Sequence, residues 1–143
     1  MRRVAMMRAT FPDALVTGHE PLIPAMTNDP KDRHVLAAAV RADAAVIVTT
    51  NLKDFPSAAL APYDIDAVSP DDFLLNQLEL NRIATLTCVV DMAHARNRPP
   101  VRPVELLDRF SVIAPQFAEE AKAQILNQSE PSPWLIHQRR EID

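Results

Sequence analysis

Two groups of polar residues flank an apolar stretch of this chain, and their side chains are the candidates for a functional site. Asp32 precedes the stretch, whereas Thr49, Thr50, Asn51 and Asp54 follow it. Carboxylate, amide and hydroxyl groups of this kind could bind a ligand together at the carboxyl edge of a parallel sheet, where open α/β sheets bind their ligands. Whether the two groups meet there depends on the elements between them.

The stretch between the polar groups predicts one helix followed by one strand. Asp29 can cap the helix, and the next clear break is near Asp43. Ala44–Val48 is then an almost wholly apolar run with β-branched residues, typical of a parallel strand covered on both faces. About eleven helical residues rise roughly 16 Å, and about six strand residues rise roughly 20 Å. Because a helix packs antiparallel to the strand that follows it, these similar lengths predict that Asp32 lies at the same edge as the residues after the strand.

These residues together resemble the second half of a PIN domain, and they most resemble the VapC-type toxins of toxin–antitoxin pairs. The core of the resemblance is Asp32-x-His34-φ-φ-Ala37-Ala38 followed by Ile47-Val48-Thr49-Thr50-Asn51-x-x-Asp54-Phe55. The longer pattern adds Asp29-Pro30 before the first motif and Ser69-Pro70-Asp71-Asp72-Phe73-Leu74 after the second, and it matches a PIN subgroup with a helical C-terminal extension. The resemblance is dense from about Phe11 to Leu75 and weaker from Asn81 to about Ala123.

The resemblance implies metal-dependent cleavage of RNA. In that family, clustered acidic groups hold Mg²⁺ or Mn²⁺, which can lower the pKa of a bound water and neutralise charge on the phosphate. By position in the motifs, Asp32 is implied as a catalytic residue and metal ligand, Asn51 as a catalytic residue and Asp54 as a metal ligand. Thr49 and Thr50 are implied as substrate contacts. The implied partners are an RNA substrate and a cognate antitoxin protein, and a homodimer stays open.

The chain departs from the family pattern near its start. The family's first acidic residue lies on an N-terminal strand and its second is a Glu on a later helix, and neither motif is present here. Asp13–Val16 imitates the first only faintly, and Glu20 falls in a predicted loop. Met1–Arg8 resembles the end of a helix that normally stands mid-domain, so we expect a PIN domain without its N-terminal third. Two hypotheses therefore stay open: an endoribonuclease, and a catalytically silent PIN remnant that acts as a protein-interaction module.

The expected fold class is α/β, with a PIN-like three-layer α/β/α arrangement around a parallel sheet and a C-terminal helical extension. The expected boundaries are 1–75 for the C-terminal part of the PIN domain, 76–127 for the helical extension and 128–143 for a flexible tail. Strands are predicted at Asp13–Thr17, Ala44–Val48 and Asp64–Val68. Helices are predicted from Ser69 to about Glu79, from the cap residue Asn81 to about Arg96, from Val104 to Ile113 and from Pro115 to Asn127.

Composition limits the remaining alternatives. The 143 residues are 48% hydrophobic and 24% charged, which is ordinary for one globular domain. The net charge of −4 argues against nonspecific RNA binding by the whole surface. A single glycine excludes a glycine-rich phosphate loop, and no stretch reaches the apolar length of a membrane span, so we expect a cytoplasmic protein. The single cysteine, Cys88, predicts a buried thiol without an internal disulfide.

Overall fold

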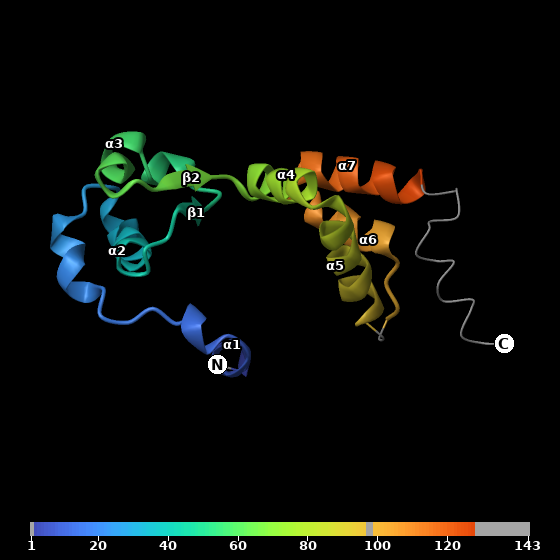
Figure 1. Cartoon of the computed structure of the whole chain (residues 1–143), viewed down its shortest axis with the longest axis horizontal. Helices are drawn as coiled ribbons and strands as arrows, with labels where there is room; N and C mark the ends of the chain where they lie inside the picture. The colour runs from blue at the N-terminus through green and yellow to red at the C-terminus, as the bar shows by residue number, and fades with distance from the viewer. Residues whose placement is uncertain (1, 97–98, 128–143) are drawn as a thin grey trace. The chain divides into compact units, whose positions relative to one another are not determined.

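Two short parallel strands and the helices around them form the first part of the chain. The computed structural model describes residues 2–96 and 99–127, and its contacts divide the chain into two units, Met1–Ser69 and Pro70–Asp143 (Figure 1). The division falls six residues before the expected boundary at residue 75, so the helix that begins at Pro70 belongs with the helical extension.

Strands β1 (Val46–Val48) and β2 (Asp66–Val68) are parallel neighbours. The backbone N–H of Thr49 donates to the carbonyl of Val68 at 2.9 Å and extends the ladder by one residue. The prediction of a strand covered on both faces is wrong for β1. Ile47 is buried, but Val46 and Val48 are 40% and 44% exposed, because no described element covers their side of the sheet.

Helix α2 (Arg33–Arg41) precedes β1 and follows a 3₁₀ turn at Pro30–Asp32. Asp29, predicted as the cap of the helix, instead caps this turn, since its Oδ1 accepts the Lys31 N–H at 3.1 Å, and the N-cap of α2 itself is Asp32. The predicted break after the helix is also present, with Asp43 in the left-handed conformation at φ 55°. Leu36 and Ala37 on α2 are fully buried. They join the core of this unit, which also contains Met26, Ile47, Phe55, Ala59, Leu60 and Ile65.

The N-terminal segment contains helices where a strand was expected. Helix α1 (Arg2–Thr10) agrees with the predicted helix end and has no buried residue. The predicted strand at Asp13–Thr17 is wrong, because Pro12–Ala14 form a 3₁₀ turn and the residues after it pair with no strand. Pro12 at the start of the turn holds φ in the helical range. Glu20–Ala25, expected as a loop, form a second 3₁₀ helix.

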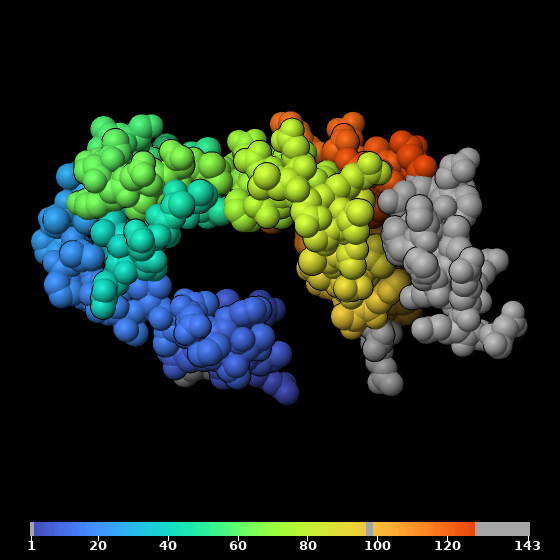
Figure 2. Space-filling model, viewed as in Figure 1, coloured from blue at the N-terminus to red at the C-terminus, as the bar shows by residue number. Residues whose placement is uncertain are grey.

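The described residues of the second unit form four helices, which lie against one another in the space-filling view (Figure 2). The helices are α4 (Pro70–Leu80), α5 (Arg82–His94), α6 (Pro103–Phe110) and α7 (Pro115–Leu126). Asn81 caps α5 as predicted, with its Oδ1 accepting the Ala84 N–H at 3.1 Å. The core of the unit comprises Leu78, Leu86, Val89, Ala93, Val101, Leu106, Leu107, Ala114, Phe117 and Ala121.

A carboxylate from α4 caps the N-terminus of α7. Asp71 accepts the Phe117 N–H at 2.8 Å and the Gln116 N–H at 3.2 Å. The cap residue of α7 itself is Ala114, whose side chain can accept no hydrogen bond. Asp71 therefore satisfies two backbone donors that α7 cannot satisfy from its own sequence, and it joins the two helices.

The parallel strand pair with flanking helices is compatible with the expected α/β class, and the three-layer PIN arrangement stays a prediction. The expected tail, 128–143, lies outside the described residues. The expected burial of Cys88 is wrong, because α5 turns Leu86 and Val89 toward the core and leaves Cys88 exposed. Among the helices described, none has the length and apolar content that crossing a membrane would require.

Candidate metal centre

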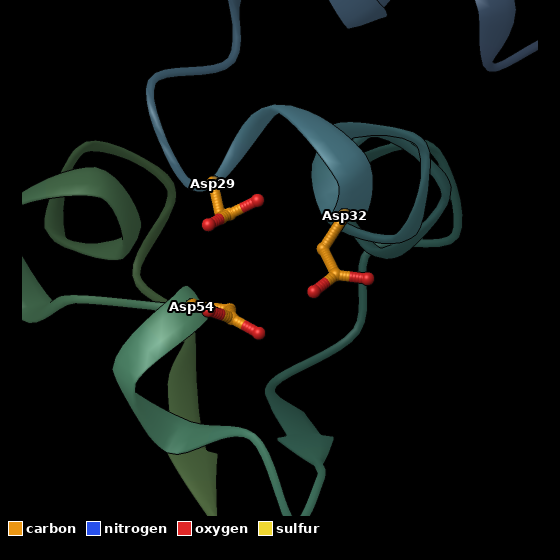
Figure 3. A group of neighbouring side chains, drawn as sticks. All are labelled: Asp29, Asp32 and Asp54. Carbon is orange, nitrogen blue, oxygen red and sulfur yellow. The ribbon is translucent and has the colours of Figure 1, made fainter.

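Three aspartates meet at one place in the first unit. Asp29, Asp32 and Asp54 each offer a carboxylate oxygen, and these oxygens all lie within 4.8 Å of one another. Figure 3 shows that the carboxylates converge on a common space from two segments, the turn before α2 and the turn after β1. The structure therefore brings the predicted pair Asp32 and Asp54 together and adds Asp29 to them.

The local sequence explains how the acids come together. Asp29 and Asp32 begin and end one tight turn, and an i, i+3 spacing places both side chains on the same side of it. Asp54 closes the 3₁₀ turn Leu52–Asp54 that follows β1. The Asp29 N–H donates to the Asp54 carbonyl at 3.2 Å, so the two turns are joined directly by their backbones.

A lysine ammonium lies among the three carboxylates. Lys31 Nζ donates to Asp54 Oδ2 at 2.8 Å and lies 3.4 Å from Asp29 Oδ1 and 3.7 Å from Asp32 Oδ2. The side chain of Asp54 is only 6% exposed, whereas that of Lys31 is 62% exposed. The lysine therefore enters the cluster from the solvent side and neutralises its most buried acid.

The contact between Lys31 and Asp54 shifts the pKa of both groups. The hydrogen bond from the ammonium lowers the pKa of the Asp54 carboxyl below its ordinary value of 3.8. The same hydrogen bond raises the pKa of Lys31 above its ordinary value of 10.5. Burial opposes both shifts because it penalises charged forms, but its effect is smaller than that of the hydrogen bond. Both groups are therefore charged throughout the neutral pH range.

A buried asparagine supports the turn that carries Asp32. The Asn28 Nδ2 donates to the Asp32 carbonyl at 3.1 Å, and the Arg33 Nε donates to the Asn28 carbonyl at 3.0 Å. Asn28 is only 2% exposed, so these bonds are protected from water. Two polar atoms near this turn, Asn28 Oδ1 and Asp32 Oδ2, are buried without a hydrogen-bond partner. The Asp32 oxygen thus keeps free capacity to coordinate a cation.

The other predicted site residues lie on the segment between β1 and Asp54. Thr49 is half-buried, and its Oγ1 accepts the Asn51 N–H at 3.0 Å. Thr50 and Asn51 are exposed, and Asn51 precedes the turn that ends at Asp54. Asn51 meets the cluster through its backbone, because the Asp54 N–H donates to the Asn51 carbonyl at 3.0 Å. The roles of Thr49, Thr50 and Asn51 in substrate binding and catalysis stay predictions.

The donor set fits a hard divalent cation. Three carboxylates supply oxygen ligands, Asp32 Oδ2 accepts no hydrogen bond, and the space between the acids holds a positive charge in the form of Lys31. Mg²⁺ binds through one or two carboxylates while it retains several waters, so this set is large enough for it. Chemically, such a site can hold a cation at the edge of an exposed polar segment.

Sequence reasoning identified Asp32 and Asp54 and missed three residues of the site. Asp29 was assigned only as a helix cap, although its spacing from Asp32 indicated a shared face. Lys31 and Asn28 carried no motif signal. The contact between Lys31 and Asp54 joins residues 23 positions apart, so it depends on how the two turns pack.

Comparison with known proteins gives two similarities. The family described as "VapC50 C-terminal domain" matches residues 70–123, which begin at the first residue of α4. The protein "Putative ribonuclease VapC50" of Mycobacterium tuberculosis (strain ATCC 25618 / H37Rv) is 54% identical over 109 residues. The aligned region covers 76% of this chain and 64% of that protein, so the chain spans less than two thirds of its relative's length. No solved structure matches the chain.

Proposed function

We propose that the chain belongs to the VapC-type PIN ribonucleases and that it acts in metal-dependent cleavage of RNA. One structural observation supports this proposal more strongly than any other. Asp29, Asp32 and Asp54 come from two separate turns and still place their oxygens within 4.8 Å of one another. Carboxylates this close repel each other, and a cation bound among them relieves that repulsion.

In the proposed reaction, the three aspartates would hold a divalent cation, and segment 49–51 leads into the turn that carries Asp54. When bound, Mg²⁺ or Mn²⁺ lowers the pKa of a coordinated water and neutralises charge that develops on a phosphate. Asp32, with an oxygen that accepts no hydrogen bond, serves as the principal ligand. Asp54 supplies a second carboxylate whose position is held by burial. Asn51 contributes a neutral oxygen at a place where many family members have Asp.

The proposed substrate is a single strand of RNA, and the proposed partner is an antitoxin protein that blocks the site. With a net charge of −4, the chain cannot rely on general electrostatic attraction to the RNA backbone. Binding would then depend on the metal and on local contacts, for which the exposed Thr50 and the half-buried Thr49 are suited. A homodimer is a further proposal, and no described feature favours the silent-remnant hypothesis over the ribonuclease.

The proposed function is tested by RNA cleavage with and without the family's N-terminal part. This chain by itself should cleave RNA slowly, because it offers ligands from one side of the site only. A version extended at its N-terminus by the strand and the Glu-bearing helix of a longer relative should cleave RNA with Mg²⁺ and lose that activity in EDTA. An extended protein that folds but shows no metal-dependent cleavage would contradict the proposal.

A further inference from the structure

The position of Lys31 is the feature that the proposed reaction does not use. Its Nζ lies 2.8 to 3.7 Å from oxygens of all three aspartates, which is the place a metal bound by the same oxygens would take. An ammonium and a divalent cation cannot share this space, because they repel each other and need the same lone pairs. Binding of the metal therefore requires that the lysine leave.

The surroundings of Lys31 allow it to leave. Its side chain is 62% exposed and hangs on a flexible four-carbon stem, so the ammonium can swing into solvent without opening the core. Its backbone is held in place, because the Lys31 N–H donates to Asp29 Oδ1 and the Asp29 N–H donates to the Asp54 carbonyl. The acids would thus keep their places while the cation is exchanged.

We propose that Lys31 is an internal counter-cation that holds the three carboxylates together in the absence of metal and competes with the divalent cation for them. The inference rests on the proposed function, since it assigns a role at the same metal site. It has two consequences: Lys31 lowers the metal affinity of the site, and it keeps the cluster assembled until metal arrives.

The first test compares Mn²⁺ binding by the full chain with that of two variants, using the loss of the free Mn²⁺ signal in electron paramagnetic resonance. Lys31→Met removes the ammonium and preserves the length of the stem. Lys53→Met is the matched control, because Lys53 adjoins Asp54 in sequence and is exposed but makes no ion pair with the three aspartates. We expect Lys31→Met to bind Mn²⁺ about tenfold more tightly, because ligand charge sets the affinity of such sites, and Lys53→Met to bind nearly as the parent does.

The second test needs no substitution and therefore does not depend on the folding of Lys31→Met. Limited acetylation of the parent chain, read by mass spectrometry, reports how freely each lysine amine reacts. Lys31 should react slowly without metal and several-fold faster when Mg²⁺ is added, while Lys53 and Lys122 keep their rates. Asp32→Asn should weaken the effect of Mg²⁺ on Lys31.

The outcomes separate this inference from the proposed function. If the parent binds Mn²⁺ and Lys31→Met binds it equally or more weakly, Lys31 does not compete and the inference fails while the metal site stands. An unchanged Lys31 acetylation rate at saturating Mg²⁺ would overturn the inference in the same way. If neither the parent nor Lys31→Met binds Mn²⁺, the metal site fails, and the proposed function fails with the inference.

Discussion

Charge governs the candidate site at the scale of single residues. Three carboxylates surround one ammonium, so the described cluster has a net charge of −2 at neutral pH. The three acids are not equivalent in their surroundings. Asp54 is nearly buried and accepts the short bond from Lys31, whereas Asp32 is half-buried and has an oxygen without a hydrogen bond. The structure thus separates a residue that is held by a hydrogen bond from Lys31 from one whose oxygen accepts no hydrogen bond.

Two substitutions should distinguish the roles of Asp32 and Asp54. In the N-terminally extended protein, we expect Asp32→Asn to lower RNA cleavage at least about 100-fold, since it removes a charge where the reaction needs it. The melting temperature should hold or rise, because one repulsive charge is gone. Asp54→Asn should cost less activity but lower the melting temperature, because its bond to Lys31 weakens.

Asp43→Asn is the matched control for both substitutions. Asp43 is an exposed acid in the left-handed conformation, which Asn adopts readily. It should leave cleavage and melting nearly unchanged. Full activity in Asp32→Asn with the same Mg²⁺ dependence would remove Asp32 from the ligand set.

The pH dependence of stability should follow the ion pair of Lys31 and Asp54. The pKa of Asp54 is lower in the folded state than its ordinary value of 3.8. The folded state is therefore favoured above that ordinary value, and this contribution is lost as the pH falls through the lower, folded value. We expect metal-free chain to lose stability below about pH 4, and Lys31→Met to lose less over the same range. Melting curves in EDTA from pH 7 to pH 3 measure the difference.

At the scale of elements, the short turns matter more than the helices they join. Asp29 caps the turn Pro30–Asp32 and also gives the cluster a carboxylate, so one residue serves both local structure and the site. In the second unit, Asp71 is also a cap, but its role is structural only. It lies in the first turn of α4 and caps α7, and so couples two helices whose sequences show no common motif.

Removal of the Asp71 cap should destabilise the helical unit. Asp71→Ala leaves the N–H groups of Gln116 and Phe117 without their partner in a largely buried place. We expect a loss of about 2–3 kcal/mol in the free energy of unfolding of this unit, as for hydrogen bonds to a charged acceptor. Urea titration followed by amide exchange of the α7 residues provides the measurement.

Glu79→Ala provides the comparison on the same helix, because Glu79 is exposed near the end of α4. Its effect should stay within about 0.5 kcal/mol. Equal losses in Asp71→Ala and Glu79→Ala would mean that the cap contributes nothing beyond helix propensity.

At the scale of the whole molecule, the described part of the chain contains two separate cores and a poorly covered strand, β1. Each unit buries its own set of apolar residues. Strand β1 has a single strand neighbour in the described structure, and Val46 and Val48 on one side of it remain substantially exposed. An open edge beside exposed valines is a template for pairing with another chain.

We therefore expect the isolated 143-residue chain to self-associate or aggregate through β1 at micromolar concentration. Val46→Lys should reduce the association, because a charge on an edge strand opposes pairing. Val112→Lys changes a highly exposed valine of the helical unit and should have no such effect. Size-exclusion chromatography with light scattering and amide exchange of Val46–Val48 would detect the change. A monomeric parent with a sharp melt and protected β1 amides would show that β1 is closed by other means.

The sequence by itself determined the features that depend on neighbouring residues. The cap at Asp29, the break at Asp43, the cap at Asn81 and the strand after α2 all follow from signals within a few positions. The prediction that Asp32 and Asp54 share an edge also held, because it needed only the lengths of one helix and one strand. The family motifs pointed to the same two residues.

Only the tertiary structure decided the contacts between residues far apart in the chain. The ammonium of Lys31 beside Asp54, the cap of α7 by Asp71 and the exposure of Val46 belong to this group. The sequence around Lys31 or Asp71 would read the same whether or not a partner from a distant segment contacts the side chain. Partners separated by 23 or 46 positions meet only when elements pack, and packing depends on the shapes of both surfaces rather than on either sequence segment.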